Sequence, residues 1–404
     1  MNTTERLPHP PLLTDFPFNV GTRLLAPGDI RATPQQRDAY LDRYTRQGDP
    51  AADAVVEMLR RLPPREGRRM FDTATEYGID AVPHPPEELV EFFRQVDTIP
   101  YWLDTDRLDR GCRVIGRTGI IGITALSMLA LMGGYMASRV TKTLVSTGNL
   151  EHMAGRRIAE TTSWFMDVTT PGGLQRHAPG CKTTIHVRLM HALARAGMNR
   201  RPDWSYDEWD HPINQSQMAG TNMLFGLATL SGSQALGIHF THSERDAVYH
   251  LWRYVGHLLG ITPDLLPADE HDNWRIWWLQ AHYEFGHPDA DSTRLAQALT
   301  QALAPLVVGN RHTPLHHAQS VAVTGIMCAY ARLTLGHGNA DILGLPDQKA
   351  FRALVIASGA AIKALEIPRQ LIPGATSISE ALGRRSQLAL AKRMTLSCRH
   401  RTSR

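Results

Sequence analysis

The sequence predicts an all-α protein built as a single large helical domain, and three observations carry that prediction. Helix start signals recur along the chain, with Thr or Asp followed by Pro at the first helical position. Strand signals are sparse, because no run of alternating Val, Ile and Thr lies between turn residues. The 404 residues, of which 43% are hydrophobic, suffice to bury a large core.

The first helices are marked by their N-caps. Thr33-Pro34-Gln35-Gln36 combines a Thr cap, Pro at the first helical position and Gln three residues after the cap. Asp49-Pro50 opens a second helix, AADAVVEMLRRL, which ends at Pro63-Pro64. The segment HPPEELVEFFRQV starts in the same manner, with Pro and then acidic residues in its first turn.

The later helices are indicated by apolar periodicity. A long amphipathic helix begins at Ser243-Glu244 and ends at Gly260 and Pro263. Its apolar stripe consists of Val248, Leu251, Trp252, Val255, Leu258 and Leu259. Further helices fit residues 293–307, 314–336 and 347–365.

The uncharged stretch from Thr118 to Ser138 has two interpretations. Arg117 and Arg139 bracket it, and its length is sufficient to span a bilayer. Its glycines and hydroxyl side chains, and the long regions on both sides, favour a fully buried central helix instead. We therefore expect burial, with membrane association as the less favoured alternative.

Charge and cysteine content narrow the class of protein. A formal net charge of +4 does not predict nucleic-acid binding. The four cysteines lie far apart and form neither a zinc motif nor a compact disulfide framework. Since the N-terminal residues show no signal-peptide pattern, we expect reduced thiols and a cytoplasmic protein.

Three regions follow from the composition. Residues 1–35 are Pro-rich and are predicted to form an N-terminal arm, and residues 36–383 the helical domain. Residues 384–404 are rich in Arg and Lys and are predicted to form a basic C-terminal tail, as a solvated, partly frayed helix. A role of this tail at acidic lipids or nucleic acid is the less favoured alternative.

Residues 155–195 are predicted to form two helices joined by a Pro/Gly-rich turn, and they carry the candidate site. On the second helix, His191 lies three residues after Arg188 and four before Arg195, so the three share a face. One imidazole does not make a zinc site, which needs three or four protein ligands. Haem iron needs only one axial protein ligand, and guanidinium groups can pair with the haem propionates. The alternative is an ordinary core or surface histidine.

The first of these two helices offers three polar groups at helical spacing. Arg157, Glu160 and Thr161 lie at i, i+3 and i+4 and share a face. An arginine, a carboxylate and a hydroxyl together can orient a bound oxygen ligand and move protons. The alternative is a solvated Arg–Glu pair.

Arg-x-x-x-Thr, a glycine-containing connection and Val-Arg-x-x-His-Ala-x-x-Arg follow one another in this order. With this pattern, residues from about 99 to 261 resemble the catalytic domain of the latex clearing protein (rubber oxygenase) family. The same domain occurs in the fungal oxygenase that cleaves the prenyl chain in mycophenolic acid synthesis. The resemblance implies a globin-like helical core around haem b, with His191 as the iron ligand and Arg157 and Thr161 in the distal pocket. It also favours burial of residues 118–138.

The chain departs from these relatives at two positions. The rubber oxygenases have a distal Lys where this chain has Glu160. They also have a Glu, thought to act as a base, close to where Thr141 or Lys142 falls here. A Lys-capped iron is therefore not expected, and Glu160 is a candidate for a general base or for neutralising Arg157.

These features lead us to expect a haem b-dependent oxygenase that uses O2 on an apolar, unsaturated or isoprenoid-like small molecule. Oxidative cleavage of a C=C bond is the candidate reaction, and apolar residues of 118–138 are expected to line the cavity. Rubber itself is not expected as the substrate, since an intracellular enzyme does not meet an extracellular polymer. One alternative is a haem-binding sensor, carrier or peroxide scavenger without oxygenase turnover, and another is a helical protein without haem. The sequence does not predict the oligomeric state.

Three other clusters are given structural roles. Glu208-Trp209-Asp210-His211 has the ExxH spacing of di-iron proteins but lacks a second such motif, and Pro212 ends the helix. His250 and His257 are expected to be satisfied at a helix interface. The aromatic cluster is expected to pack in the core rather than line a substrate groove; it comprises Trp274, Trp277, Trp278, His282 and Tyr283.

Overall fold

Helices make up all of the regular secondary structure in the computed structural model, which describes residues 5–146, 150–309 and 313–402. The all-α prediction is confirmed, because these ranges contain no strand. The globin-like arrangement of the core remains a prediction.

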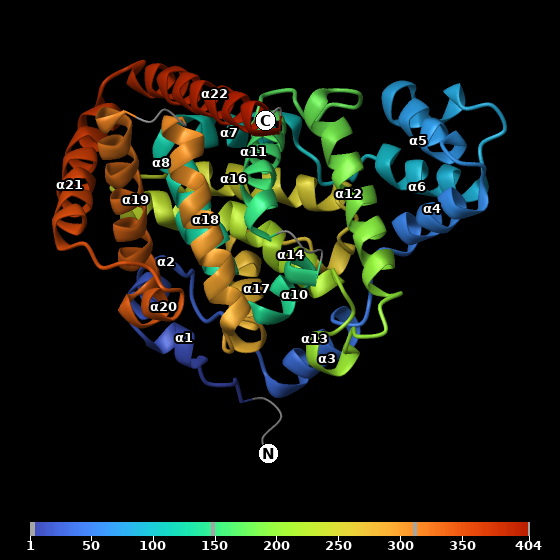
Figure 1. Ribbon diagram of the computed structural model, residues 1–404, viewed down its shortest axis with the longest axis horizontal. Helices are drawn as coiled ribbons and strands as arrows, with labels where there is room; N and C mark the ends of the chain where they lie inside the picture. The colour runs from blue at the N-terminus through green and yellow to red at the C-terminus, as the bar shows by residue number, and fades with distance from the viewer. Residues whose placement is uncertain (1–4, 147–149, 310–312, 403–404) are drawn as a thin grey trace.

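The N-terminal part begins against the core and then extends to one end of the molecule, where α4, α5 and α6 lie together (Figure 1). The predicted cap of α3 is confirmed, since Thr33 and Gln36 form a capping box. Asp49 caps α4 by accepting from the Ala52 N–H at 3.2 Å. The elements are α1 (Pro11–Thr14), α2 (Phe18–Leu25), α3 (Pro34–Tyr44), α4 (Pro50–Arg61), α5 (Glu66–Tyr77), the 3₁₀ turn η1 (Ile79–Ala81) and α6 (Glu87–Asp97).

The described part of residues 1–35, for which the sequence predicted an N-terminal arm, is packed against the domain. Leu13 and Ile30 are 3% and 1% exposed and belong to the main core. Prolines had suggested an extended segment, but apolar side chains between them anchor it to the domain.

The centre of the molecule is formed by helices that pack around α7 and α16. The apolar stripe predicted for α16 is buried throughout. The central elements are α7 (Thr105–Arg117), α8 (Gly119–Ala125), the π-helical turn η2 (Leu126–Leu131), α9 (Met132–Gly134), α10 (Ser138–Ser146), α11 (Leu150–Val168), α12 (Pro179–Met198), α13 (Tyr206–Trp209), α14 (Gln215–Met223), the π-helical turn η3 (Leu224–Ala228), α15 (Thr229–Ala235), α16 (His242–Leu258), η4 (Pro263–Leu265) and α17 (Glu270–Tyr283).

The stretch 118–138 contains one continuous helix from Gly119 to Gly134, mostly buried, as predicted. It begins with a 93° bend between α7 and α8, where Gly119 adopts a φ of +57°. It then passes through the π-helical turn η2 into α9, and most of its side chains are buried. Within the described residues, no single helix has the length and apolar character to cross a membrane; only the bent pair Thr105–Arg117 and Gly119–Gly134 passes that test jointly.

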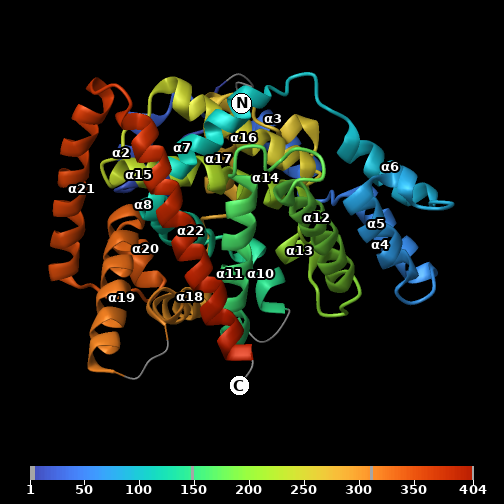
Figure 2. The same ribbon diagram turned by 90° about the horizontal axis from the view of Figure 1, so that it is seen from above.

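The C-terminal helices form an outer layer. Figures 1 and 2 show α21 at one edge of the molecule and α22 crossing its surface towards the C-terminus. The elements are α18 (Ala290–Val308), α19 (Pro314–Leu335), α20 (His337–Ile342), α21 (Lys349–Leu371) and α22 (Ala375–Thr402).

The tail from residue 384 is helical, as predicted, but it continues α22, one side of which is packed on the domain rather than solvated. A Cβ at Gly383 would lie 2.4 Å from the Gly116 carbonyl oxygen, so α22 and α7 are in backbone contact. Gln387 is fully buried and donates to the Ile115 carbonyl oxygen at 2.9 Å. Met394 is only 1% exposed. The basic composition had concealed this packing face.

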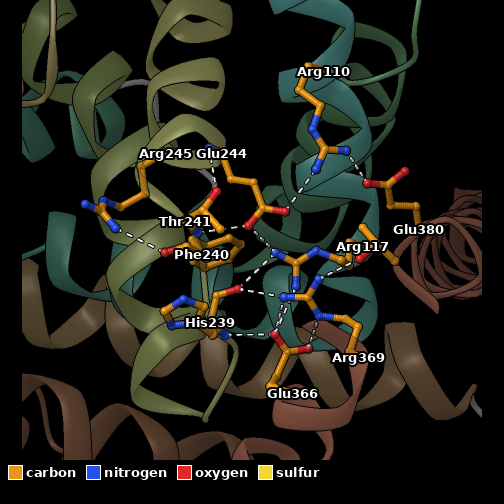
Figure 3. A network of polar contacts seen from close by, with 11 residues as sticks. Arg110, Arg117, His239, Phe240, Thr241, Glu244, Arg245, Glu366, Arg369 and Glu380 are labelled. Atoms are coloured by element: carbon orange, nitrogen blue, oxygen red, sulfur yellow. Dashed lines mark hydrogen bonds and ion pairs between the residues drawn. The ribbon is translucent and has the colours of Figure 1, made fainter. Parts of the chain in front are cut away.

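A network of ion pairs fastens the outer layer to the core (Figure 3). Arg117 of α7 is 2% exposed and pairs with Glu244 of α16 at 3.0 Å and with Glu366 of α21 at 3.1 Å. Its partners are extended by Arg369, which pairs with Glu366, and by Arg110, which pairs with Glu244 and with Glu380 of α22. Four helices are thereby held at one point.

Glu284, which follows α17, is a buried carboxyl group whose two oxygens have no hydrogen-bond partner among the described residues. Burial raises its pKa from 4.5 to about 8, the Asp210 charge adds to this rise, and the Arg139 charge opposes it. At a pH between these two pKa values, the Glu284 carboxyl group keeps its proton in the folded protein and releases it in the unfolded chain. The free energy of unfolding therefore falls as the pH rises across this window.

We expect Glu284→Gln to reduce this pH dependence, because glutamine stays neutral. Urea unfolding at pH 5, 7 and 9 will show the variant gaining stability relative to the unmodified protein as the pH rises. Identical pH dependence of the two proteins would contradict the assignment.

Candidate active site in the hairpin of α11 and α12

Helices α11 and α12 form an antiparallel hairpin whose turn brings backbone atoms very close together. The Gly173 N–H donates to the Thr170 carbonyl oxygen at 2.8 Å, and the Cys181 N–H donates to the Gly173 carbonyl oxygen at 3.0 Å. A Cβ at Gly180 would lie 2.6 Å from the Gly173 oxygen and 2.7 Å from the Asp167 oxygen. Glycine is therefore required at this turn, which sets how the helices diverge.

We expect Gly180→Ala to lower the free energy of unfolding by about 1–3 kcal/mol, because backbone atoms cannot move aside as a flexible side chain can. Urea denaturation measures this loss. The matched control is Gly197→Ala near the end of the same helix, where a Cβ would meet nothing within 4 Å. Equal effects of the two substitutions would contradict the steric argument.

One hydrogen bond identifies the sides of α11 and α12 that face each other. Trp164 of α11 donates from Nε1 to the Thr184 hydroxyl of α12 at 3.0 Å. On α11, Arg157, Glu160 and Thr161 precede Trp164 by seven, four and three residues and share its face. On α12, His191 follows Thr184 by seven residues and shares the face of that hydroxyl. Arg157 and His191 therefore each lie two helical turns from this contact, at the same level of the hairpin.

His191 is neutral at physiological pH and has no partner within the described residues. Its Nδ1 is buried without a hydrogen bond. Burial of the ring, together with the positive charge of Arg195, lowers its pKa to about 4, against the opposing charge of Asp49. A neutral imidazole without a hydrogen-bond partner can offer a nitrogen lone pair to a metal.

Arg188 and Arg195 do lie beside His191, but both are engaged by carboxylates of α4. Arg188 forms a bidentate pair with Asp49 at 2.6 and 2.9 Å, and both side chains are almost fully buried. Arg195 donates to Asp53 at 2.8 Å and to the Ile213 carbonyl oxygen at 2.8 Å. Among the guanidinium nitrogens of these two arginines, only Nη2 of Arg195 is buried without a hydrogen-bond partner. The guanidinium groups of Arg188 and Arg195, which the sequence analysis expected to pair with haem propionates, instead attach α12 to α4.

The three polar residues on α11 differ in their surroundings. Arg157 is half-buried, whereas Glu160 and Thr161 are exposed. Glu160 pairs at 2.7 Å with Arg156, not with Arg157 as the sequence suggested. Both members of that pair are more than half exposed, so solvent screens it.

The sequence analysis missed Tyr135, which follows α9 and is buried close to Arg157. Burial raises its pKa to about 12, and the Arg157 charge acts in the opposite direction. Its phenol therefore keeps its proton at neutral pH and can donate it in a hydrogen bond. The only signal in the sequence was an isolated aromatic hydroxyl at the end of the apolar stretch 118–134.

Comparison with known proteins gives the family. Residues 116–363 match the family described as the catalytic domain of ER-bound oxygenase mpaB/B′ and rubber oxygenase. The chain belongs to this oxygenase family. A rubber oxygenase from Streptomyces sp. (strain K30) is 24% identical over 320 residues, covering 74% of this chain and 71% of that protein. A solved structure of latex clearing protein LCP in the closed state has a TM-score of 0.61 and 21% identity, covering 84% of this chain and 88% of that chain.

The family domain contains both helices of the hairpin and all six residues predicted for the site. Its members are oxygenases, so the chain carries an oxidoreductase domain. The likeness to latex clearing protein shows that the all-α fold is shared.

Thr141 and Lys142, which fall close to the position of the rubber oxygenases' expected base, make other interactions in this structure. Thr141 is fully buried and donates to the Ser138 carbonyl oxygen at 2.9 Å. Lys142 pairs with Asp289 at 2.8 Å and with Asp291 at 2.7 Å. Neither side chain is placed to accept a proton in the hairpin.

The other histidine clusters have the structural roles expected of them. His250 Nε2 accepts from the Asp104 N–H at 3.0 Å, and His257 lies 3.3 Å from the Thr98 carbonyl oxygen. The helix α13 ends at Trp209, before His211, and the described residues contain no group of three or more potential metal-binding side chains. Trp274, Trp277 and Trp278 are buried in the core.

Proposed function

We propose that this oxygenase uses haem b to oxidise an apolar, unsaturated or isoprenoid-like small molecule, with cleavage of a C=C bond as its reaction. The observation that carries the proposal is the unpartnered, neutral His191 on the hairpin of α11 and α12 within an oxygenase family domain. The Streptomyces relative is a rubber oxygenase, and rubber is an unsaturated isoprenoid.

The residues present fit the iron of a haem better than its propionates. His191 would hold the iron, because haem iron needs only one ligand from the protein. Arg188 is committed to Asp49 and does not fit a propionate partner, whereas Arg195 keeps one free buried N–H group. We assign both arginines to positioning α12, and hence His191, against α4. When bound, haem supplies the activation of O2.

The chain's own residues would prepare the site for a substrate and O2. Arg157 would orient and polarise an oxygen ligand through its guanidinium N–H groups. The Tyr135 hydroxyl would hold a proton for donation near Arg157, and Thr161 would add a hydroxyl on the same row. The segment of α8, η2 and α9, to which Tyr135 is joined, would supply an apolar wall that excludes water.

Spectra and oxygen uptake of the protein purified from haem-supplemented cells test this proposal. We expect a Soret band, and oxygen uptake with an isoprenoid alkene such as squalene that matches the carbonyl product found by mass spectrometry. A Soret band without substrate-dependent uptake would favour the haem-binding alternative. A colourless protein with no iron would overturn the proposal.

We expect Glu160→Gln to leave the thermal midpoint unchanged within error and to reduce substrate-dependent oxygen uptake by less than about twofold, because general bases contribute much more than that. The reason is that this carboxylate is exposed and paired with Arg156. A loss of about 100-fold with an altered pH profile would instead make Glu160 the base of the reaction.

A further inference from the structure

The turn between α21 and α22 presents a cluster of large apolar side chains to solvent. We name it the apolar corner; its members are Leu365, Ile367, Leu371, Ile372, Ile378 and Leu382, each at least 57% exposed. Soluble domains rarely leave so many large aliphatic side chains together at the surface, and such patches mark interaction sites. The corner lies beyond residue 363, where the family match ends.

Helix α21 carries further exposed apolar side chains. Leu354 and Ile356, two residues apart and therefore on different sides of α21, are 49% and 57% exposed. Between residues 353 and 372 the exposed charged side chain is Lys363 alone, because Glu366 is partly buried and Arg369 is buried. A partner for this surface must therefore be largely apolar itself.

The charges around the apolar corner have one sign. From residue 348 onwards the sequence contains only two acidic residues, Glu366 and Glu380. Both carboxylates turn inwards to arginines of the network in Figure 3. The exposed charges nearest the corner in the chain are Lys363 on α21 and Arg385 on α22, and those on described side chains further along α22 are Lys392 and Arg393; all four are basic.

The apolar corner is held in place before any partner binds. The pairs Arg117–Glu366 and Arg110–Glu380 fasten the end of α21 and the start of α22 to α7. Binding would then cost little conformational entropy, since helices on both sides of the turn are already fixed.

We propose that the apolar corner and its basic surroundings bind the surface of an anionic lipid bilayer. Leucine and isoleucine side chains would enter the boundary between headgroups and acyl chains, and the Lys and Arg side chains would be attracted to anionic headgroups. The helices would lie on the membrane. A second copy of the chain suits the corner less well, because a symmetric contact would place basic side chains opposite one another. The inference does not depend on the proposed oxygenase reaction.

Vesicle flotation of the full chain tests this inference. We expect binding to phosphatidylcholine vesicles that contain about 30 mol% phosphatidylglycerol, and weak binding to phosphatidylcholine alone. Binding should weaken in about 0.5 M NaCl, because salt screens the basic side chains. The double variant Leu371→Ser/Ile372→Ser should lose at least tenfold in affinity while its thermal midpoint is unchanged, since both side chains are exposed.

The matched controls are Tyr77→Ser and Ile99→Ser, outside α21 and α22, where the side chains are 72% and 76% exposed. These variants should float as the unmodified protein does. Absence of flotation with anionic vesicles, or equal flotation of the double variant, would overturn the inference. A dimer in light scattering that the double variant abolishes, without vesicle binding, would assign the corner to a second copy instead. Flotation needs no turnover, so its failure is distinct from failure of the oxygenase proposal.

Discussion

His191→Ala will abolish the Soret band and the substrate-dependent oxygen uptake of this protein. Changes to groups that merely orient a metal ligand cost about 10- to 100-fold in metal affinity, so loss of the sole protein ligand should cost more than about 100-fold. The fold should persist without haem, because His191 makes no hydrogen bond to the described residues and alanine favours helix. Iron content, absorption spectra and circular dichroism measure these effects.

His186→Ala is the matched control on the same helix. His186 donates from its ring nitrogens to Asp72 and to the Lys182 carbonyl oxygen, and its ring packs on Phe71 of α5. The His186→Ala protein should therefore keep the Soret band. A His191→Ala protein with full haem content would overturn the ligand assignment, whatever its activity.

Arg188→Leu will lower the free energy of unfolding by about 3–5 kcal/mol, the usual cost of breaking a buried ion pair from one side. Arg188 and Asp49 side chains are 3% and 4% exposed, so the remaining carboxylate would be left in a medium that does not solvate it. Urea denaturation measures the loss, and haem affinity should fall with it because α12 loses its attachment to α4.

Arg188→Leu combined with Asp49→Asn should recover much of this stability. Asparagine removes the buried charge and still caps α4, as Asp49 does through Ala52. The exposed Arg156–Glu160 pair is the comparison: Arg156→Leu should lower the free energy of unfolding much less. A similar effect of the Arg188 and Arg156 substitutions would contradict the role of the buried pair.

Local signals in the sequence predicted the helices well. The starts of α3 and α4 depend on caps within four residues, and both were confirmed. The 93° bend between α7 and α8 was missed, because it is packed against α22 from nearly 270 residues later. Likewise the buried face of α22 depends on Gly116 and Ile115 of α7, which no local pattern reveals.

The candidate site was predictable to the same extent. Helical spacing placed Arg188, His191 and Arg195 on one side of α12, and the structure keeps them together. Spacing did not show that Asp49 and Asp53, about 140 residues earlier, would occupy the two arginines. Nor did it show that Glu160 would choose Arg156, since both guanidinium groups are within reach of one carboxylate on a helix.

The hairpin of α11 and α12 acts as a lever. His191 and Arg157 each lie seven residues, or about 10 Å, beyond the contact of Trp164 with Thr184. At that radius, opening the two helices by about 10° would move Arg157 and His191 apart by about 2 Å, and displacements of about 1 Å can cost 100-fold in rate. Substitutions in the turn 169–178 would therefore retune the reaction without touching a reacting group. Relatives with different substrates can be expected to differ in that turn as much as in the pocket.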